Sequence, residues 1–137
     1  MNGSVFFAMA GMGAKVRAAA LVAKDGFSAR YDLDRIRGVF SRPQHKLAGE
    51  SYVGRVLVLD VAKGGVATAW MLYEMKSRGV APAALVLNAV NPIMAQGAAL
   101  ADFTMISGFA QDITEAIPNG ALVEVDPTGA RPCIRIV

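Results

Sequence analysis

Cysteine and charge are both scarce in this chain. Cys133 is the only cysteine among 137 residues, so no internal disulfide can form, and the chain cannot supply the several thiolates that an iron–sulfur cluster needs. Cys133 precedes Ile134 in an apolar stretch, where we predict a small packing residue with no chemistry. Charged residues make up only 18% of the chain and hydrophobic residues 54%, so the chain is more apolar than an average domain. We expect part of this surplus to cover a partner.

Long apolar runs and a secretory leader are also missing. The apolar residues fall in short runs such as 56–59 and 84–87, whereas a membrane-spanning helix needs about 20 in succession. Residues 1–7 lack the positively charged start of a signal peptide. These patterns predict a cytoplasmic protein with no membrane partner.

The positive charge is modest and dispersed. The net charge is +3 and the isoelectric point is near 9.3, but the Lys and Arg residues are scattered and do not alternate with aromatic residues as on a nucleic-acid surface. We therefore predict small anions as ligands, and no nucleic-acid partner.

The pattern of apolar runs and glycines predicts a single domain over residues 1–137 with α/β character. The length fits one core, and β-type segments stand at both ends of a strand–turn–helix middle, which predicts a compact β/β/α fold. The predicted elements are strands at 16–23, 55–59, 82–87 and 104–106, helices at 66–77 and 92–95 (the second closed by Gly97), a closing hairpin of 122–125 with 133–137, and a polar loop over 24–49 with one strand at 36–40.

The best candidate for chemistry is the glycine-containing segment Lys63–Thr68. Gly64 and Gly65 follow a strand and precede a helix, so their backbone N–H groups and the helix N-terminus suit an anion. Lys63 would add a positive charge and Thr68 a hydroxyl. The spacing matches neither a Walker A loop nor a dinucleotide fingerprint, and a purely structural turn is the alternative.

Three polar side chains of the 24–49 loop form a second candidate group. His45 is the only histidine and is a candidate to titrate near neutral pH or to donate to a carboxylate; alternatively it is solvated. Asp32 and Arg30 are candidates for a carboxylate clamp, or else belong, with Asp34, to a solvated loop surface. We predict no metal ligands in this chain.

The aromatic residues of the 66–77 helix are predicted to pack. Trp70, Tyr73 and Met75 share this helix with alanines and leucine, which favours a core face over a cofactor site. An exposed portion of this group would indicate an interface.

The order of the segments resembles the swivel domain, or small subunit, of the aconitase X family over most of the chain. The matching segments are Gly26–Ser28 leading to Asp32, His45–Ser51, Val53–Leu59, the loop at Gly64, Ala81–Val86, and Asn91–Ile93 through Gly97–Ala98. In the family, the corresponding motifs are a Ser-Phe-Trp-Gly-Gly run ending in Asp, His-Pro-Leu-x-Gly-Glu-Ser, Gly-Lys-Val-Leu-Val, Arg-Gly-Ser and Ala-Pro-Ala-Ala.

The resemblance implies a swivelling β/β/α domain similar to the fourth domain of aconitase, acting as a hydro-lyase only together with a large subunit. That subunit would hold an iron–sulfur cluster or divalent metal, and this chain alone no cofactor. Activities in the family are dehydrations of cis-3-hydroxy-L-proline and of mevalonate 5-phosphate. We expect a cis-3-hydroxy-L-proline-like substrate, with the mevalonate 5-phosphate enzyme as the alternative. The resemblance and the loop together assign catalysis to Thr68, Lys63 and His45, and substrate binding to Gly64, Gly65, Asp32 and Arg30.

The chain departs from the family at two motifs. Gly65 stands where the family loop carries a serine expected to act in catalysis, and Ser28-Ala29-Arg30 replaces the Trp-Gly-Gly run. Thr68 lies about one helical turn further on, so its hydroxyl points differently from one in the turn. Three readings remain: an enzyme subunit with a different hydroxy acid, a non-catalytic assembly subunit, and a free-standing anion-binding module.

Overall fold

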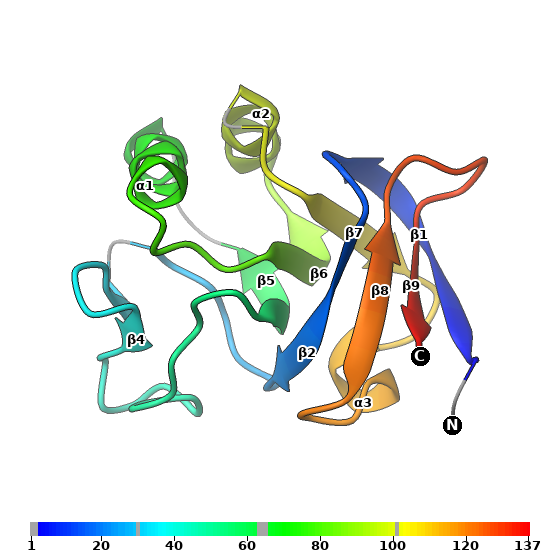
Figure 1. Ribbon diagram of the computed structural model, residues 1–137, viewed down its shortest axis with the longest axis horizontal. Coiled ribbons are helices and arrows are strands. Elements are labelled where there is room, and N and C mark those ends of the chain that lie inside the picture. The colour runs from blue at the N-terminus through cyan, green and yellow to red at the C-terminus, as the bar shows by residue number, and fades with distance from the viewer. Residues whose placement is uncertain (1–2, 30, 63–65, 101) are drawn as a thin grey trace.

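Seven strands close into a barrel in the computed structural model, which describes residues 3–29, 31–62, 66–100 and 102–137 (Figure 1). The order around the barrel is β1-β7-β6-β5-β2-β8-β9, and β9 pairs with β1 to close it. The pairs among β2, β5, β6 and β7 are parallel, and the others are antiparallel. The strands are β1 (Val5–Met12), β2 (Val16–Val22), β5 (Val56–Ala62), β6 (Ala84–Val90), β7 (Met105–Phe109), β8 (Leu122–Asp126) and β9 (Cys133–Ile136).

Two longer helices cover one side of the barrel. Helices α1 (Val66–Ser77) and α2 (Pro92–Leu100) lie side by side, and the single-turn helix α3 (Ile113–Ala116) lies against β5 and β6 (Figure 1). The predicted bounds of the 66–77 helix are confirmed. It ends where Gly79 adopts a φ of 73°, a left-handed conformation that glycine tolerates and that ends a helix. None of the helices in the described part of the chain is long and apolar enough to cross a membrane.

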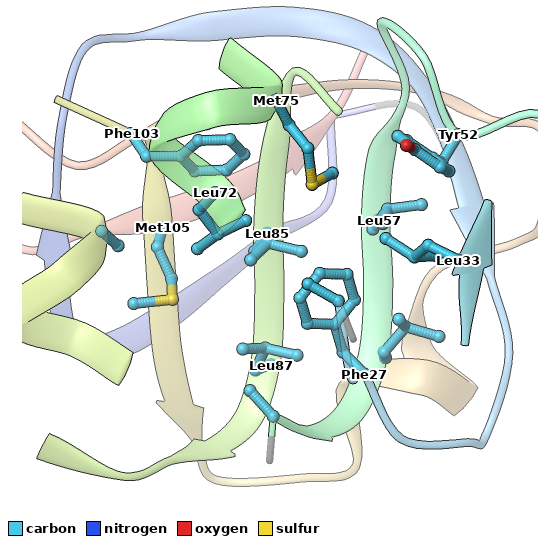
Figure 2. Close-up of a cluster of buried hydrophobic side chains, with 14 of the residues drawn as sticks. Phe27, Leu33, Tyr52, Leu57, Leu72, Met75, Leu85, Leu87, Phe103 and Met105 are labelled. Carbon is cyan, nitrogen blue, oxygen red and sulfur yellow. The ribbon is translucent and has the colours of Figure 1, made fainter. Parts of the chain in front are cut away.

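The parallel strands are buried on both faces. In β5, Leu57 and Leu59 pack under the helices, while Val56 and Val58 face the barrel interior. Figure 2 shows the helix-side cluster, in which Leu72 and Met75 of α1 meet the leucines of β5 and β6. Burial on both faces explains the unbroken apolar runs of the sequence, because alternation would put a polar residue in one of the two cores.

The sequence prediction missed β1 and α3. The predicted elements begin with the strand at 16–23, but Val5–Met12 already form β1 and Gly13 turns the chain between the two strands. Gly13 has a φ of 93°, and a Cβ there would lie 2.6 Å from the Cα of Thr104, so glycine is required. The prediction failed because β1 acquires its partners β7 and β9 only when the barrel closes.

Two predicted boundaries are also wrong. Helix α2 does not end at Gly97 but continues to Leu100, because packing against α1, with Ala98 fully buried, outweighs the low helix propensity of glycine. The predicted strand at 36–40 is instead a hairpin of two-residue strands, β3 (Leu33–Asp34) and β4 (Val39–Phe40). The Asp34 carboxylate accepts the backbone N–H groups of Ile36 and Arg37 in the hairpin turn. These N–H groups are therefore not available for pairing in a continuous strand.

Candidate functional site

The candidate anion loop lies where the chain passes from β5 to α1. β5 ends at Ala62 and α1 begins at Val66; Lys63, Gly64 and Gly65 lie outside the described residues, as does Arg30. Thr68 lies in the first turn of α1, which contains no acidic residue. A helix N-terminus without a carboxylate in its first turn favours anions through its N–H groups and its dipole.

A segment of the long loop runs alongside the end of β5. The backbone carbonyl of Asp25 accepts the N–H of Asp60 at 2.9 Å, and the N–H of Phe27 donates to the carbonyl of Val61 at 2.8 Å. Phe27 also pairs with Ala62 in a parallel bridge. Residues 25–27 therefore extend the sheet beside the last residues of β5, directly before the candidate loop.

His45 is buried and holds this segment in place. Its Nε2 lies 2.8 Å from the carbonyl oxygen of Gly26, and its Nδ1 lies 3.0 Å from the backbone N of Leu47. The ring stacks on Phe40 at a centroid distance of 4.6 Å. A backbone N–H can only donate, so Nδ1 accepts and the proton is on Nε2. The alternative of a solvated histidine is wrong, and both ring nitrogens are engaged with the main chain.

Asp32 pairs with Arg42, a residue that the sequence prediction did not single out. The Asp32 side chain is 6% exposed, and its Oδ1 lies 2.5 Å from Nε of Arg42. Its Oδ2 accepts the backbone N–H of Ser28 at 3.0 Å. The alternative that placed Asp32 on a solvated loop surface is therefore wrong. No local spacing could have revealed this pair, because the two residues lie ten positions apart in irregular structure.

The same cluster includes a second carboxylate. The carboxylate of Asp25 accepts the backbone N–H groups of Gly26 and Lys46. Although burial opposes it, the bonds from Lys46 and Gly26 lower the pKa of Asp25, and the bond to Asp32 raises the pKa of Arg42. We call Asp25, Asp32, Arg42 and His45 the loop cluster. Most of its hydrogen bonds go to the main chain, so it shapes the loop.

A second polar cluster lies at the end of the barrel beside α3. Asn88 donates to the carboxylates of Asp60, at 2.9 Å, and Asp112, at 2.8 Å, and accepts the N–H of Ile113. Asp112 caps α3 by accepting from Thr114. The hydrogen bonds from Asn88 and Thr114 hold the pKa of Asp112 well below its ordinary value. We call Asp60, Asn88, Asp112 and Thr114 the barrel-end cluster.

Of the three large residues of α1 that were predicted to pack, only Met75 does so. Met75 is buried, whereas the exposed fractions of Trp70 and Tyr73 are 67% and 53%. The two rings meet edge to face, with centroids 6.2 Å apart. Trp70 and Tyr73 therefore form an exposed aromatic pair on the helix that follows the candidate loop.

The described residues do not fit a metal site. Across the described ranges, no group of three or more His, Cys, Asp or Glu side chains is arranged to hold a metal ion. Cys133 is half-buried in β9, and burial raises the pKa of its thiol, which disfavours the thiolate that binds metals.

The family model of the aconitase X swivel domain matches residues 8–135. The chain belongs to this family. The match spans all seven strands except the first residues of β1 and the last residue of β9, so the predicted resemblance and the α/β swivel-domain fold are confirmed.

Members of the aconitase X family with similar sequences come from archaea. The chain is 34% identical over 114 residues to the phosphomevalonate dehydratase small subunit of Methanopyrus kandleri, covering 83% of this chain and 84% of that protein. It is 33% identical over 116 residues to the protein of the same name from Methanocella arvoryzae, covering 85% and 88%. In fold, the chain matches the crystal structure of Thermococcus kodakaraensis aconitase X in its holo-form, with a TM-score of 0.87, 23% identity, and coverage of 98% and 99%.

Proposed function

We propose that this chain is the small subunit of a two-chain dehydratase that removes water from mevalonate 5-phosphate (phosphomevalonate). The carrying observation is that α1, whose first turn holds no acidic residue, begins shortly after the carboxyl end of β5 in the parallel part of the sheet, in a chain of the aconitase X swivel family. The names of the archaeal relatives favour phosphomevalonate over cis-3-hydroxy-L-proline.

The role we assign to this chain is to bind the anionic substrate. Lys63 supplies charge, Gly64 and Gly65 supply backbone N–H donors, and Thr68 supplies a hydroxyl. These groups hold a phosphate or carboxylate but include no strong base. Dehydration also needs a base that removes a proton and an acid that carries off hydroxide. We assign both to the large subunit, because His45 engages both ring nitrogens with the main chain.

We likewise assign the iron–sulfur cluster or divalent metal to the large subunit. A metal or cluster in a dehydratase acts as a Lewis acid on the departing hydroxyl. The described residues of this chain offer it no set of ligands.

The exposed aromatic pair supports a contact with the large subunit. Trp70 and Tyr73 lie one to two turns beyond the start of α1, on the helix that follows the candidate loop. Aromatic residues are enriched at protein interfaces. The small-subunit names of the relatives agree with such a partner.

The test is a dehydration assay of this chain co-purified with an aconitase X large subunit. The substrates are mevalonate 5-phosphate and cis-3-hydroxy-L-proline, and each subunit alone is the control. We expect water loss from mevalonate 5-phosphate only when both chains are present. Turnover of the proline derivative alone would overturn the substrate assignment, and turnover by the large subunit alone would overturn the role of this chain.

Lys63→Ala tests the anion-binding role. A lost charge-assisted hydrogen bond is worth about 1.5–3 kcal/mol, which corresponds to a rise in KM of roughly 10- to 100-fold. Lys63→Arg is the matched control, because it keeps the charge, and we expect a much smaller rise in KM. An unchanged KM for Lys63→Ala, with normal complex assembly, would remove Lys63 from the site.

The glycine at position 65 favours a second candidate, an assembly subunit without a catalytic side chain. Gly65 stands in place of the serine of the family loop, so this chain lacks that hydroxyl. Gly65→Ser distinguishes the two readings. If the native complex is inert and the Gly65→Ser complex dehydrates mevalonate 5-phosphate, the chain is an assembly subunit. Activity of the native complex establishes the enzyme.

A further inference from the structure

The sheet next to the candidate loop is completed by a segment that is not part of a regular strand. Residues 25–27 bond to β5 through the N–H of Asp60 and the carbonyl of Val61. On its other side, β5 pairs with β6 up to Ala62 and Val90. The end of β5 is therefore placed by one regular neighbour and by one irregular segment, which needs a support of its own.

His45 supports residues 25–27 through one hydrogen bond. Its Nε2–H donates to the carbonyl oxygen of Gly26, which lies between the two residues that bond to β5. The opposite ring nitrogen accepts from Leu47, and the stacked ring of Phe40 covers one face. The imidazole side chain is 0% exposed, so it contacts neither solvent nor a diffusing substrate.

Two carboxylates lie near His45 but make their hydrogen bonds to other groups. Asp25 and Asp32 lie 3.8 Å and 3.9 Å from Nε2, beyond hydrogen-bond distance. Asp25 accepts from the backbone of Gly26 and Lys46, and Asp32 accepts from Ser28 and Arg42. Protonation of Nδ1 would set its new N–H against the N–H of Leu47. The hydrogen bond from Leu47 thus selects the arrangement in which Nδ1 accepts and Nε2–H donates to Gly26.

We infer that His45 is a positioning residue for the dehydratase, and that it sets the end of β5 by donating a hydrogen bond to the carbonyl oxygen of Gly26. This inference rests on the proposed function, because the end of β5 leads into the proposed substrate loop. It gives His45 a positioning role in place of the predicted catalytic one. A misplacement of about 1 Å at a binding group lowers a rate by roughly 100-fold, so a small shift of this strand end has a large effect.

Two isosteric variants separate the possible roles. In His45→Gln, the amide nitrogen takes the place of Nε2 and keeps the bond to Gly26. In His45→Asn, the amide oxygen takes the place of Nδ1, keeps the bond from Leu47, and cannot reach Gly26. In the two-subunit complex, we expect kcat/KM within about 3-fold of native for Gln and a loss of about 10- to 100-fold for Asn. The pH profile of the Gln variant should match that of the native complex.

A proton-transfer role predicts a different outcome. Both variants would then lose activity by about 100-fold or more, and one limb of the pH profile would disappear. A purely structural role predicts that both variants lose thermal stability and activity in parallel. Either result overturns the inference.

A measurement on the full chain without turnover keeps this test separate from the proposed function. Nitrogen NMR should show a hydrogen-bonded proton on Nε2 of His45. Amide exchange of Asp60 and Phe27 should be faster in His45→Asn and unchanged in His45→Gln. Failure of the native complex to dehydrate either substrate refutes the proposed function alone. Equal exchange rates in the two variants, or the absence of a proton on Nε2, refute the positioning role.

Discussion

The loop cluster and the barrel-end cluster both lie next to β5, but they are built differently. In the loop cluster, His45 and both carboxylates bond mainly to backbone groups of irregular segments. In the barrel-end cluster, Asn88 joins two carboxylates from different elements and α3 through side chains. The first cluster therefore gives a loop its shape, whereas the second attaches one element to another. We expect damage to the first to appear mainly in activity, and damage to the second mainly in stability.

The largest effect on stability should come from Asn88→Asp. The substitution places a third carboxylate within hydrogen-bond distance of Asp60 and Asp112 and removes the amide donors. We expect the free energy of unfolding at neutral pH to fall by about 3 kcal/mol. The crowded carboxylates bind a proton more tightly in the folded state, so the loss should lessen as the pH falls below about 5. Chemical denaturation across pH measures both effects.

Gln96→Glu is the matched control for Asn88→Asp. It makes the same change of an amide to a carboxylate at an exposed position of α2. Its effect should stay within about 0.5 kcal/mol. Equal losses in the two variants would show that the barrel-end cluster does not attach α3.

Asp112→Ala should have the next largest effect. It removes the cap of α3 and leaves an amide donor of Asn88 without its partner, for an expected loss of about 2 kcal/mol. The folded-state pKa of Asp112 is lowered from 3.8. Its contribution is therefore complete above pH 3.8 and is lost as the pH falls below that value.

The pH dependence checks this assignment to Asp112. The stability difference between the native chain and Asp112→Ala should shrink in acid, as measured by urea denaturation from pH 7 to pH 3. A difference that stays constant over this range would mean that the Asp112 charge contributes nothing. Glu74→Ala, which breaks an exposed i,i+4 pair with Arg78, should change stability by less than about 0.5 kcal/mol.

The smallest effect should come from Tyr52→Phe, next to the loop cluster. Tyr52 is fully buried, and its hydroxyl has no hydrogen-bond partner in the part of the chain that the structure describes (Figure 2). Burial raises the pKa of this phenol. Because an unpaired buried hydroxyl costs free energy, we expect the variant to be equally stable or more stable by about 1 kcal/mol. Tyr73→Phe, on the exposed face of α1, is the control, and a clear loss in thermal denaturation would show a hidden partner for Tyr52.

The predictions from the sequence succeeded where local signals coincide. Gly79 indicates the end of the 66–77 helix, and Leu72 and Met75 indicate its packing face. The same holds for the closing hairpin, where Pro127 and Gly129 separate two apolar runs. The predictions failed for β1, whose partners lie far along the chain, and for α3, which is too short to show a period. In the candidate site, Arg42 was missed because only the folded loop brings it to Asp32.

The sequence alone determined the family, the α/β character and the place of the candidate loop, because these depend on short motifs and on the order of apolar runs. Only the tertiary structure decided that the strands close into a barrel, because β1 must pair with both β7 and β9. It also decided that His45 is buried and bonded to the main chain. The environment of a side chain in an irregular loop depends on contacts distant in sequence, and no local pattern encodes them.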